Sequence, residues 1–178
     1  MPSRLGHGRT LDLDVRNSLS WRGEGEPPWR AVLAERVRAM VPEWRAALGL
    51  SDFKLGDIEL DMVVYNDGAF YGRHTDLATG THRSTAQQVD GKAGKDRMIT
   101  AVYYFHGEPK GFGGGALRLH PLAAPATEPR FADIPPDQNS LAVFPAWVPH
   151  EVMPVRCPSG KFADSRFAIN CWVRRAPQ

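Results

Sequence analysis

A histidine and an aspartate two positions apart, His74 and Asp76 in the stretch YGRHTD, are the side chains best suited to metal chemistry. On an extended backbone alternate side chains point to the same face, so the imidazole and the carboxylate can reach one point while Thr75 turns away. A neutral nitrogen and an anionic oxygen suit a borderline divalent ion. A second, distant histidine would complete the set that is typical of non-haem iron(II) sites.

The third ligand must come from the other histidines. Three of them lie in polar arm, loop or turn segments, where a solvated side chain is expected: His7, His82 and His106. In the stretch ALRLH, His120 shares a face with Arg118, so we expect it to point to solvent. His150 follows the apolar stretch LAVFPA and its turn, at a strand mouth of the kind where barrel folds place ligands. We therefore predict His150 as the third ligand.

The stretch RFAINCWV places a cation where an anion could be bound. Strand alternation gives it one apolar face and one mixed face, and the mixed face holds Arg166, Ala168, Asn170 and Trp172. A guanidinium that points into a barrel is costly unless it holds an anion, which a dicarboxylate cosubstrate would provide. Arg166 is therefore a candidate anchor for such a ligand. The alternative is a surface arginine at the start of a strand.

Residues 29–50 predict a helix that supports these strands. Apolar residues recur there at helical spacing, Pro27 and Pro28 precede the run, and Gly49 supplies a stop. Pro42 lies inside the run and should kink the helix or split it in two.

After Gly49 the apolar pattern becomes strand-like, and short segments alternate with glycine and proline turns. This pattern predicts a mainly β fold, a double-stranded β-helix (jelly roll, cupin-like) with supporting N-terminal helices. We expect a single domain over 1–178, with an N-terminal arm and helical support at 1–55 and the jelly-roll core at 56–178. The polar stretch 77–96 should be a mobile surface loop.

The composition argues against several classes of function. The net charge is +2 and the basic residues are scattered, so we expect no nucleic-acid partner. No apolar run approaches the length of a membrane span, and the first residues lack the apolar segment of a secretory signal. Cys157 and Cys171 form no Cys-x-x-Cys pair and fit a reducing, cytoplasmic location. The sequence indicates no oligomeric state.

Six stretches occur in the order found in a known family: YGRHTD, RMITAVYYF, GGALRLHP, FADIPP, LAVFPAWVPHEVMPV and RFAINCW. Together they resemble the catalytic core of the Fe(II)- and 2-oxoglutarate-dependent prolyl hydroxylases, in particular the hypoxia-factor prolyl hydroxylases and their bacterial relatives. The resemblance covers roughly residues 60 to 174. It is specific because the ligand motif, the second histidine and the arginine lie within matching strands in one order.

The resemblance implies a role for each matching position. The iron ligands would be His74, Asp76 and His150, and Arg166 would bind the far carboxylate of 2-oxoglutarate. Tyr104 would help to bind the same carboxylate, and Tyr65 would lie near the cosubstrate and the substrate. Arg97 and Trp172 would lie near the substrate. Leu117 and Val152 would be apolar walls of the pocket. Tyr71 matches by motif, although a packed tyrosine is the commoner role. Fe(II) would be the cofactor, 2-oxoglutarate and O2 the cosubstrates, and ascorbate a possible reductant.

The sequence also departs from the family pattern. The segment CPSGKFAD before Arg166 is longer than in the family, so Lys161 or Arg156 is an alternative anion-binding residue. Asp61 stands where an apolar pocket residue is usual. It could bind a cationic group of a substrate, although pairing with a nearby arginine is the simpler expectation.

These observations predict a dioxygenase that hydroxylates an unactivated C–H bond, with a prolyl residue in a protein or peptide as the favoured substrate. The resemblance, Arg97, Trp172 and the expected mobile loop favour the prolyl substrate, and a free amino acid or another small metabolite is the alternative. A non-enzymatic alternative is a cupin-like module that binds metal for sensing or scaffolding. Arg166 argues against that module, since a binder needs no cosubstrate anchor.

Overall fold

A computed structural model describes residues 17–20, 27–77, 96–122 and 130–177. In chain order its elements are β1 (Leu19–Ser20), α1 (Pro28–Ala47), β2 (Leu55–Tyr65), β3 (Tyr71–His74), β4 (Arg97–Phe105), β5 (Gly113–Gly114), β6 (Leu117–Leu119), β7 (Ala132–Ile134), β8 (Ser140–Pro145), β9 (His150–Val152), β10 (Val155–Arg156), a 3-10 turn (Phe162–Asp164) and β11 (Arg166–Arg175). Two expected features, the loop at 77–96 and the histidines His7 and His82, lie almost wholly outside the described residues.

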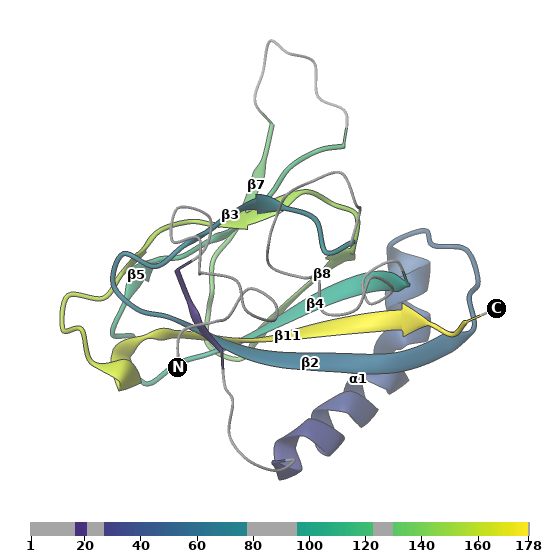
Figure 1. Cartoon of the computed structure of the whole chain (residues 1–178), viewed down its shortest axis with the longest axis horizontal. Coiled ribbons are helices and arrows are strands. Elements are labelled where there is room, and N and C mark those ends of the chain that lie inside the picture. Colours follow the sequence, from purple (N-terminus) through teal and green to yellow (C-terminus); the bar gives the residue numbers. More distant parts are fainter. Residues whose placement is uncertain (1–16, 21–26, 78–95, 123–129, 178) are drawn as a thin grey trace, which may run out of the picture.

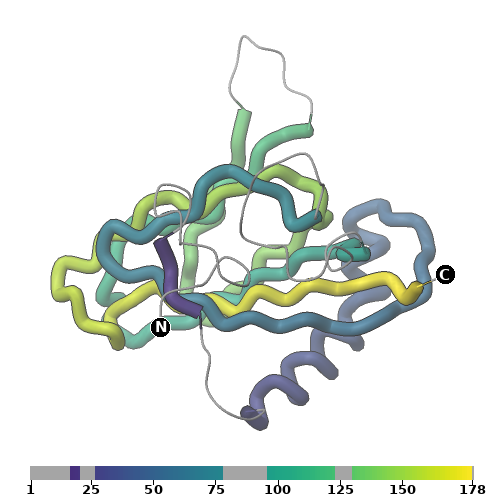
Figure 2. Tube along the Cα trace, in the orientation of Figure 1, coloured from purple at the N-terminus to yellow at the C-terminus, as the bar shows by residue number. Residues whose placement is uncertain are grey.

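Two antiparallel sheets face each other (Figure 1). The major sheet has the strand order β1-β2-β11-β4-β8, and the minor sheet has the order β3-β9-β6-β7. A short pair, β10 with β5, lies beside them. In Figure 2 the last strand, β11 (yellow), runs alongside β2 (blue). Its register partners lie on β2 and on β4, so β11 lies between these two strands. This arrangement confirms the predicted jelly roll.

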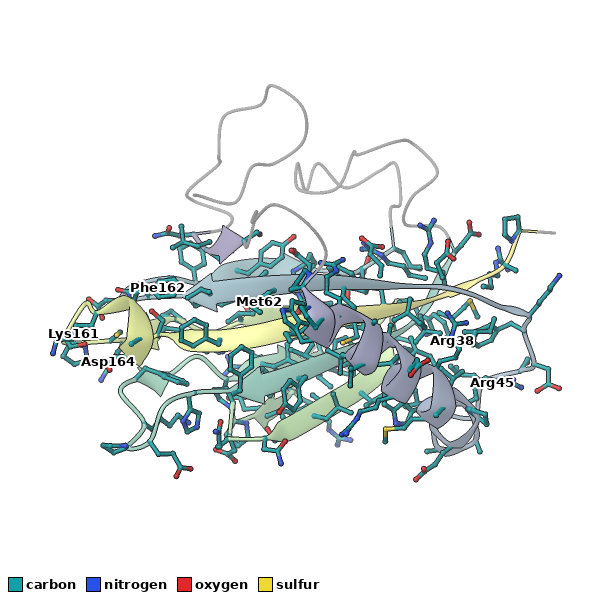
Figure 3. The ribbon with its side chains drawn as sticks, turned by 90° about the horizontal axis from the view of Figure 1, so that it is seen from below. Arg38, Arg45, Met62, Lys161, Phe162 and Asp164 are labelled. Atoms are coloured by element: carbon teal, nitrogen blue, oxygen red, sulfur yellow. The ribbon has the colours of Figure 1, made fainter. Side chains whose placement is uncertain are left out.

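Strand alternation gives the major sheet two different faces. The outward face packs against α1, which crosses it obliquely in Figure 3, through an apolar cluster of Val37, Val41, Trp44, Leu60, Ile99, Ala101, Ile169, Cys171 and Val173. The inward face meets the minor sheet through a second cluster that includes Val63, Tyr65, Val102, Tyr104, Phe144, Ala168, Tyr71, Leu117 and Val152. The predicted parity of the RFAINCWV strand is therefore correct.

One helix, α1, covers the outward face, and Pro42 does not split it. The described residues hold one supporting α-helix where several were expected, and the alternative of a split at Pro42 is wrong. Pro42 is exposed, so water can reach the carbonyl that loses its helical donor, while Val41 and Trp44 bury their side chains against the sheet. In the part of the chain that the structure describes, no helix is long and apolar enough to cross a membrane.

Candidate active site

Three predicted ligands meet between two neighbouring strands of the minor sheet. His74 ends β3 and is the register partner of His150, the first residue of β9, and Asp76 follows two residues after the strand. The register shifts between Tyr71 and His74, which indicates a bulge that sets the direction of this imidazole. One ligand atom from each of the three residues lies within 4.8 Å of the others. The structure therefore brings the three predicted residues together, and their binding of iron stays a prediction.

Both imidazoles present the same nitrogen to the centre of the cluster. The Nδ1 atom of His74 lies 2.8 Å from the carbonyl oxygen of Gly72, and that of His150 lies 2.9 Å from the carbonyl oxygen of Val148. An Nδ1–H that donates to a carbonyl leaves the Nε2 lone pair free for a metal. The Nε2 atoms of His74 and His150 lie 3.9 Å and 3.6 Å from the nearest Asp76 oxygens.

The carboxylate of Asp76 is buried and held as an anion. Burial raises its pKa, but His150 and His74, the hydroxyl of Thr100 and Arg97 together outweigh that effect and hold the pKa below its usual value. The Thr100 hydroxyl donates to Oδ2 of Asp76 at 2.6 Å. A carboxylate oxygen and two imidazole Nε2 atoms are the donor types that suit Fe(II), so these residues could hold that ion. The role of Thr100 was not predicted, although it shares the parity of Tyr104 in the stretch RMITAVYYF.

Aromatic and apolar side chains close around the two imidazoles. Tyr71 stacks on His74 with the ring centroids 3.7 Å apart, and Phe144 meets His150 edge-on at 4.9 Å. Leu117 and Val152 are register partners on β6 and β9, and both are buried. The two ring contacts hold the imidazoles in place, and Leu117 and Val152 belong to the same apolar cluster as Tyr71 and Phe144. Tyr71 therefore has the packed role that its motif left open.

Arg166 is buried next to Tyr65 and Tyr104, two members of the inward-facing cluster. It is 1% exposed, and its Nε donates to the carbonyl oxygen of Gly115 at 2.7 Å. Its guanidinium carbon lies 4.9 Å and 5.0 Å from the ring centroids of Tyr65 and Tyr104. A Cβ on Gly115 would lie 2.7 Å from Cδ of Arg166, so only glycine leaves room for this arrangement. Gly115 was not predicted as a site residue, since its glycine-rich stretch is equally typical of an ordinary turn.

Tyr104 supplies an unsatisfied donor next to that cation. Its hydroxyl is buried without a hydrogen-bond partner among the described residues, and burial raises its pKa to about 12 although Arg166 lowers it. A protonated phenol and a guanidinium side by side in a water-poor interior suit a carboxylate. The residues therefore fit the distal carboxylate of 2-oxoglutarate. The alternatives Lys161 and Arg156 are both exposed.

A family model for the 2OG-Fe(II) oxygenase superfamily matches residues 60–174, which is more than half of the chain. The chain belongs to this superfamily. The match confirms the predicted Fe(II)- and 2-oxoglutarate-dependent oxygenase domain, and Fe(II) and 2-oxoglutarate are the groups that the family implies.

Similar proteins are hydroxylases or oxygenases by name. An uncharacterised PKHD-type hydroxylase of Synechocystis sp. is 39% identical over 153 residues, which cover 84% of this chain and 46% of the relative. The chain thus spans less than half the length of that relative. In fold it resembles a prolyl-4-hydroxylase of Pseudomonas putida, with a TM-score of 0.62, 24% identity, and 95% of this chain and 78% of the other covered. It also resembles a 2OG-Fe(II) oxygenase of Burkholderia pseudomallei, with a TM-score of 0.52, 16% identity, and 90% and 66% covered.

The residues predicted to lie near the substrate, Arg97, Trp172 and Asp61, make contacts within the protein that the sequence did not reveal. Arg97 is 4% exposed and pairs with Glu59, and its guanidinium stacks over the ring of Trp172 at 3.9 Å. Asp61 lies opposite Asn170 on the inward face, as its parity predicted. Direct contact of Arg97, Trp172 or Asp61 with a substrate stays a prediction.

The remaining described histidines lie outside the cluster, as expected. His106 follows the end of β4, and its ring meets Phe112 edge-on at 5.7 Å. His120 is turned away from the metal ligands, but it is not simply solvated, because its Nε2 lies 2.9 Å from Oε1 of Glu151. Glu151 lies on β9, and strand alternation in the sequence could not predict that it would pair with His120.

Proposed function

We propose that this chain is an Fe(II)- and 2-oxoglutarate-dependent dioxygenase that hydroxylates an unactivated C–H bond, with a prolyl residue in a protein or peptide as the substrate. The observation that carries the proposal is one interior that joins a His-Asp-His cluster to a buried guanidinium and an unsatisfied phenol. A metal-binding module would need only the first of these parts. The name of the Pseudomonas structure supports the prolyl assignment, and the name of the PKHD-type relative supports a hydroxylase.

In this proposal each group of residues has a defined task. His74, Asp76 and His150 hold Fe(II) through two Nε2 atoms and one carboxylate oxygen. Arg166 and Tyr104 bind the distal carboxylate of 2-oxoglutarate, and Tyr65 packs against the guanidinium. When bound, the iron and the cosubstrate supply the oxidising power, with one oxygen atom of O2 going to the substrate and the other to succinate as carbon dioxide is lost.

The protein itself contributes orientation and exclusion of water. Backbone carbonyls accept from the Nδ1–H groups of both imidazoles, and Thr100 donates to the carboxylate of Asp76. The carbonyl of Gly115 accepts from Nε of Arg166 and orients its guanidinium. Because Tyr104 keeps its proton, it can donate to an anion without a compensating proton transfer. The proposal extends to one oxygenase domain over residues 1–178 and to a cytoplasmic location, for which two free buried cysteines are supporting observations. Ascorbate as a reductant and the absence of a nucleic-acid partner stay predictions.

The test is turnover by purified protein loaded anaerobically with Fe(II). We expect succinate to form when 2-oxoglutarate, O2 and proline-containing peptides are supplied, with one oxygen atom added to the peptide by mass spectrometry. The His150→Ala variant is the control and should form neither product. Oxygen added only to free amino acids or other metabolites would replace the prolyl assignment. Metal binding without any effect of 2-oxoglutarate would favour the binding module.

A further inference from the structure

Glu59 and Arg97 form a two-point ion pair on the inward side of the major sheet. The Nε and Nη2 atoms of Arg97 lie 3.1 Å and 2.5 Å from the two carboxylate oxygens of Glu59. The side chain of Arg97 is 4% exposed, whereas that of Glu59 is 38% exposed. A guanidinium so deeply buried needs an anionic partner, because an unpaired buried charge is strongly destabilising. Glu59 supplies that partner from the inward face of β2.

Arg97 also contacts the backbone of Asp76. Its Nη1 donates to the backbone carbonyl oxygen of Asp76 at 3.4 Å, which is long for a hydrogen bond, and its guanidinium lies on the Trp172 ring. All three kinds of guanidinium nitrogen therefore have a contact within the protein. The rigid fork of arginine can link a carboxylate and a carbonyl in this way, which a lysine ammonium cannot do with the same geometry.

These contacts belong to one row across the major sheet. Trp172 on β11 is the register partner of both Glu59 on β2 and Thr100 on β4. Asp76 is held at three points. Thr100 donates to its carboxylate and Arg97 to its backbone carbonyl. The backbone N–H of Asp76 donates to the carbonyl oxygen of Ala146 at 3.0 Å. Asp76 lies beyond the end of β3, so these three contacts take the place of strand pairing at this residue.

We infer that Glu59 is a positioning residue for the metal centre, acting through Arg97 to fix the backbone and carboxylate of Asp76. This inference rests on the proposed function, because it assigns Asp76 as an iron ligand. It also changes the predicted role of Arg97 from contact with the substrate to support of Asp76, because the charge of Arg97 is paired with Glu59. An anionic substrate would have to displace Glu59 to reach that guanidinium.

The test compares Glu59→Gln with Asp57→Asn, which makes the same change of charge at an exposed position of the same strand. Apo protein is titrated with Co(II) as a probe of the iron site, and the visible ligand-field spectrum is recorded. We expect Glu59→Gln to weaken Co(II) binding by about tenfold, the lower end of the range for loss of a metal ligand's own partner because Glu59 acts through Arg97, and to change the spectrum. Asp57→Asn should leave both unchanged. The affinity for 2-oxoglutarate at saturating Co(II) should stay at the wild-type value in both variants.

A purely structural role predicts a different result. Glu59→Gln would then lower the melting temperature of the apo protein while Co(II) affinity and spectrum stayed as in the wild type, and that result would overturn the inference. If the single variant does not fold, the Glu59→Gln/Arg97→Met double variant replaces it, since no buried charge is left unpaired. Weak Co(II) binding by the folded double variant supports the inference, and wild-type binding overturns it. If the wild type binds Co(II) no more tightly than His150→Ala, the proposed metal centre itself fails.

Discussion

The two faces of the major sheet come from alternate residues of the same strands, yet they differ in kind. The outward cluster under α1 is built almost wholly from aliphatic and aromatic side chains and Cys171, whose pKa burial raises to about 12. The inward face holds buried polar groups, among them Arg166, Thr100 and the Tyr104 hydroxyl. Burial on the outward face stabilises the fold, whereas the inward face accepts desolvated polar groups that a ligand can satisfy. Stability and chemistry can therefore be changed separately by substitutions one residue apart.

The largest expected effect on the inward side is loss of a metal ligand. Asp76→Ala should lower activity by more than the roughly 100-fold that an outer partner costs, because the only anionic ligand of the cluster is removed. The folded state should persist, since Asp76 lies beyond the end of β3 and belongs to neither apolar cluster. Activity is measured as succinate release, and circular dichroism reports the fold. Activity close to that of the wild type would show that Asp76 is not an iron ligand.

A substitution on the outward side of the same sheet should have the opposite outcome. Leu60→Ala removes a side chain that is 5% exposed in the cluster under α1, so we expect the free energy of unfolding to fall by about 2–5 kcal/mol. Metal affinity and activity below the melting temperature should stay unchanged. Urea denaturation and Co(II) titration measure the two quantities. A parallel loss of metal affinity would break the distinction between the faces.

At the cosubstrate end, Gly115→Ala should displace Arg166 without touching the metal ligands. The new Cβ would lie 2.7 Å from Cδ of Arg166 and 2.8 Å from Cγ2 of Val155, at a positive φ of 68°. We expect the affinity for 2-oxoglutarate to fall by about tenfold or more, the value of a hydrogen bond to a charged group, with Co(II) affinity retained. Gly113→Ala is the matched control, since nothing lies within 4 Å of its added Cβ. Calorimetry on Co(II)-loaded protein measures the affinity for 2-oxoglutarate.

Tyr104→Phe should have a similar or smaller effect on 2-oxoglutarate affinity, about tenfold, because one donor to the carboxylate is lost. Tyr103→Phe is the control on the outward face, where the hydroxyl donates to Asn139. An unchanged affinity in Tyr104→Phe would remove this tyrosine from the cosubstrate site.

Tyr104 also predicts an alkaline limit to stability. Its pKa rises from 10.0 to about 12 in the folded protein, so the folded state binds the proton more tightly than the unfolded state. The stability that this group contributes is complete below about pH 10 and is lost as the pH rises toward 12. Denaturation curves across that range should fall less steeply for Tyr104→Phe than for the wild type. Curves that remain parallel would contradict this assignment.

The sequence was sufficient to predict those candidate site residues whose role follows from residue type and from position in a strand. The spacing of His74 and Asp76, the apolar strand before His150 and the parity of Arg166 were sufficient to predict which side chains face one interior. The same reasoning could not find Glu59 or Gly115, because their roles depend on which residues of distant strands become neighbours. Pro42 was misjudged since its cost depends on whether the bare carbonyl is solvated, which only the packing of α1 reveals.

The position of β3 has a consequence for the dependence of the protein on iron supply. β3 is an edge strand of four residues, tied to β9 by the pairs Tyr71 with Val152 and His74 with His150. Short edge strands are among the least protected parts of a sheet against local opening. An ion shared by His74, Asp76 and His150 would fasten this edge to its neighbour. Amide exchange at residues 71–74 would then distinguish iron-replete from iron-starved protein without any measurement of catalysis.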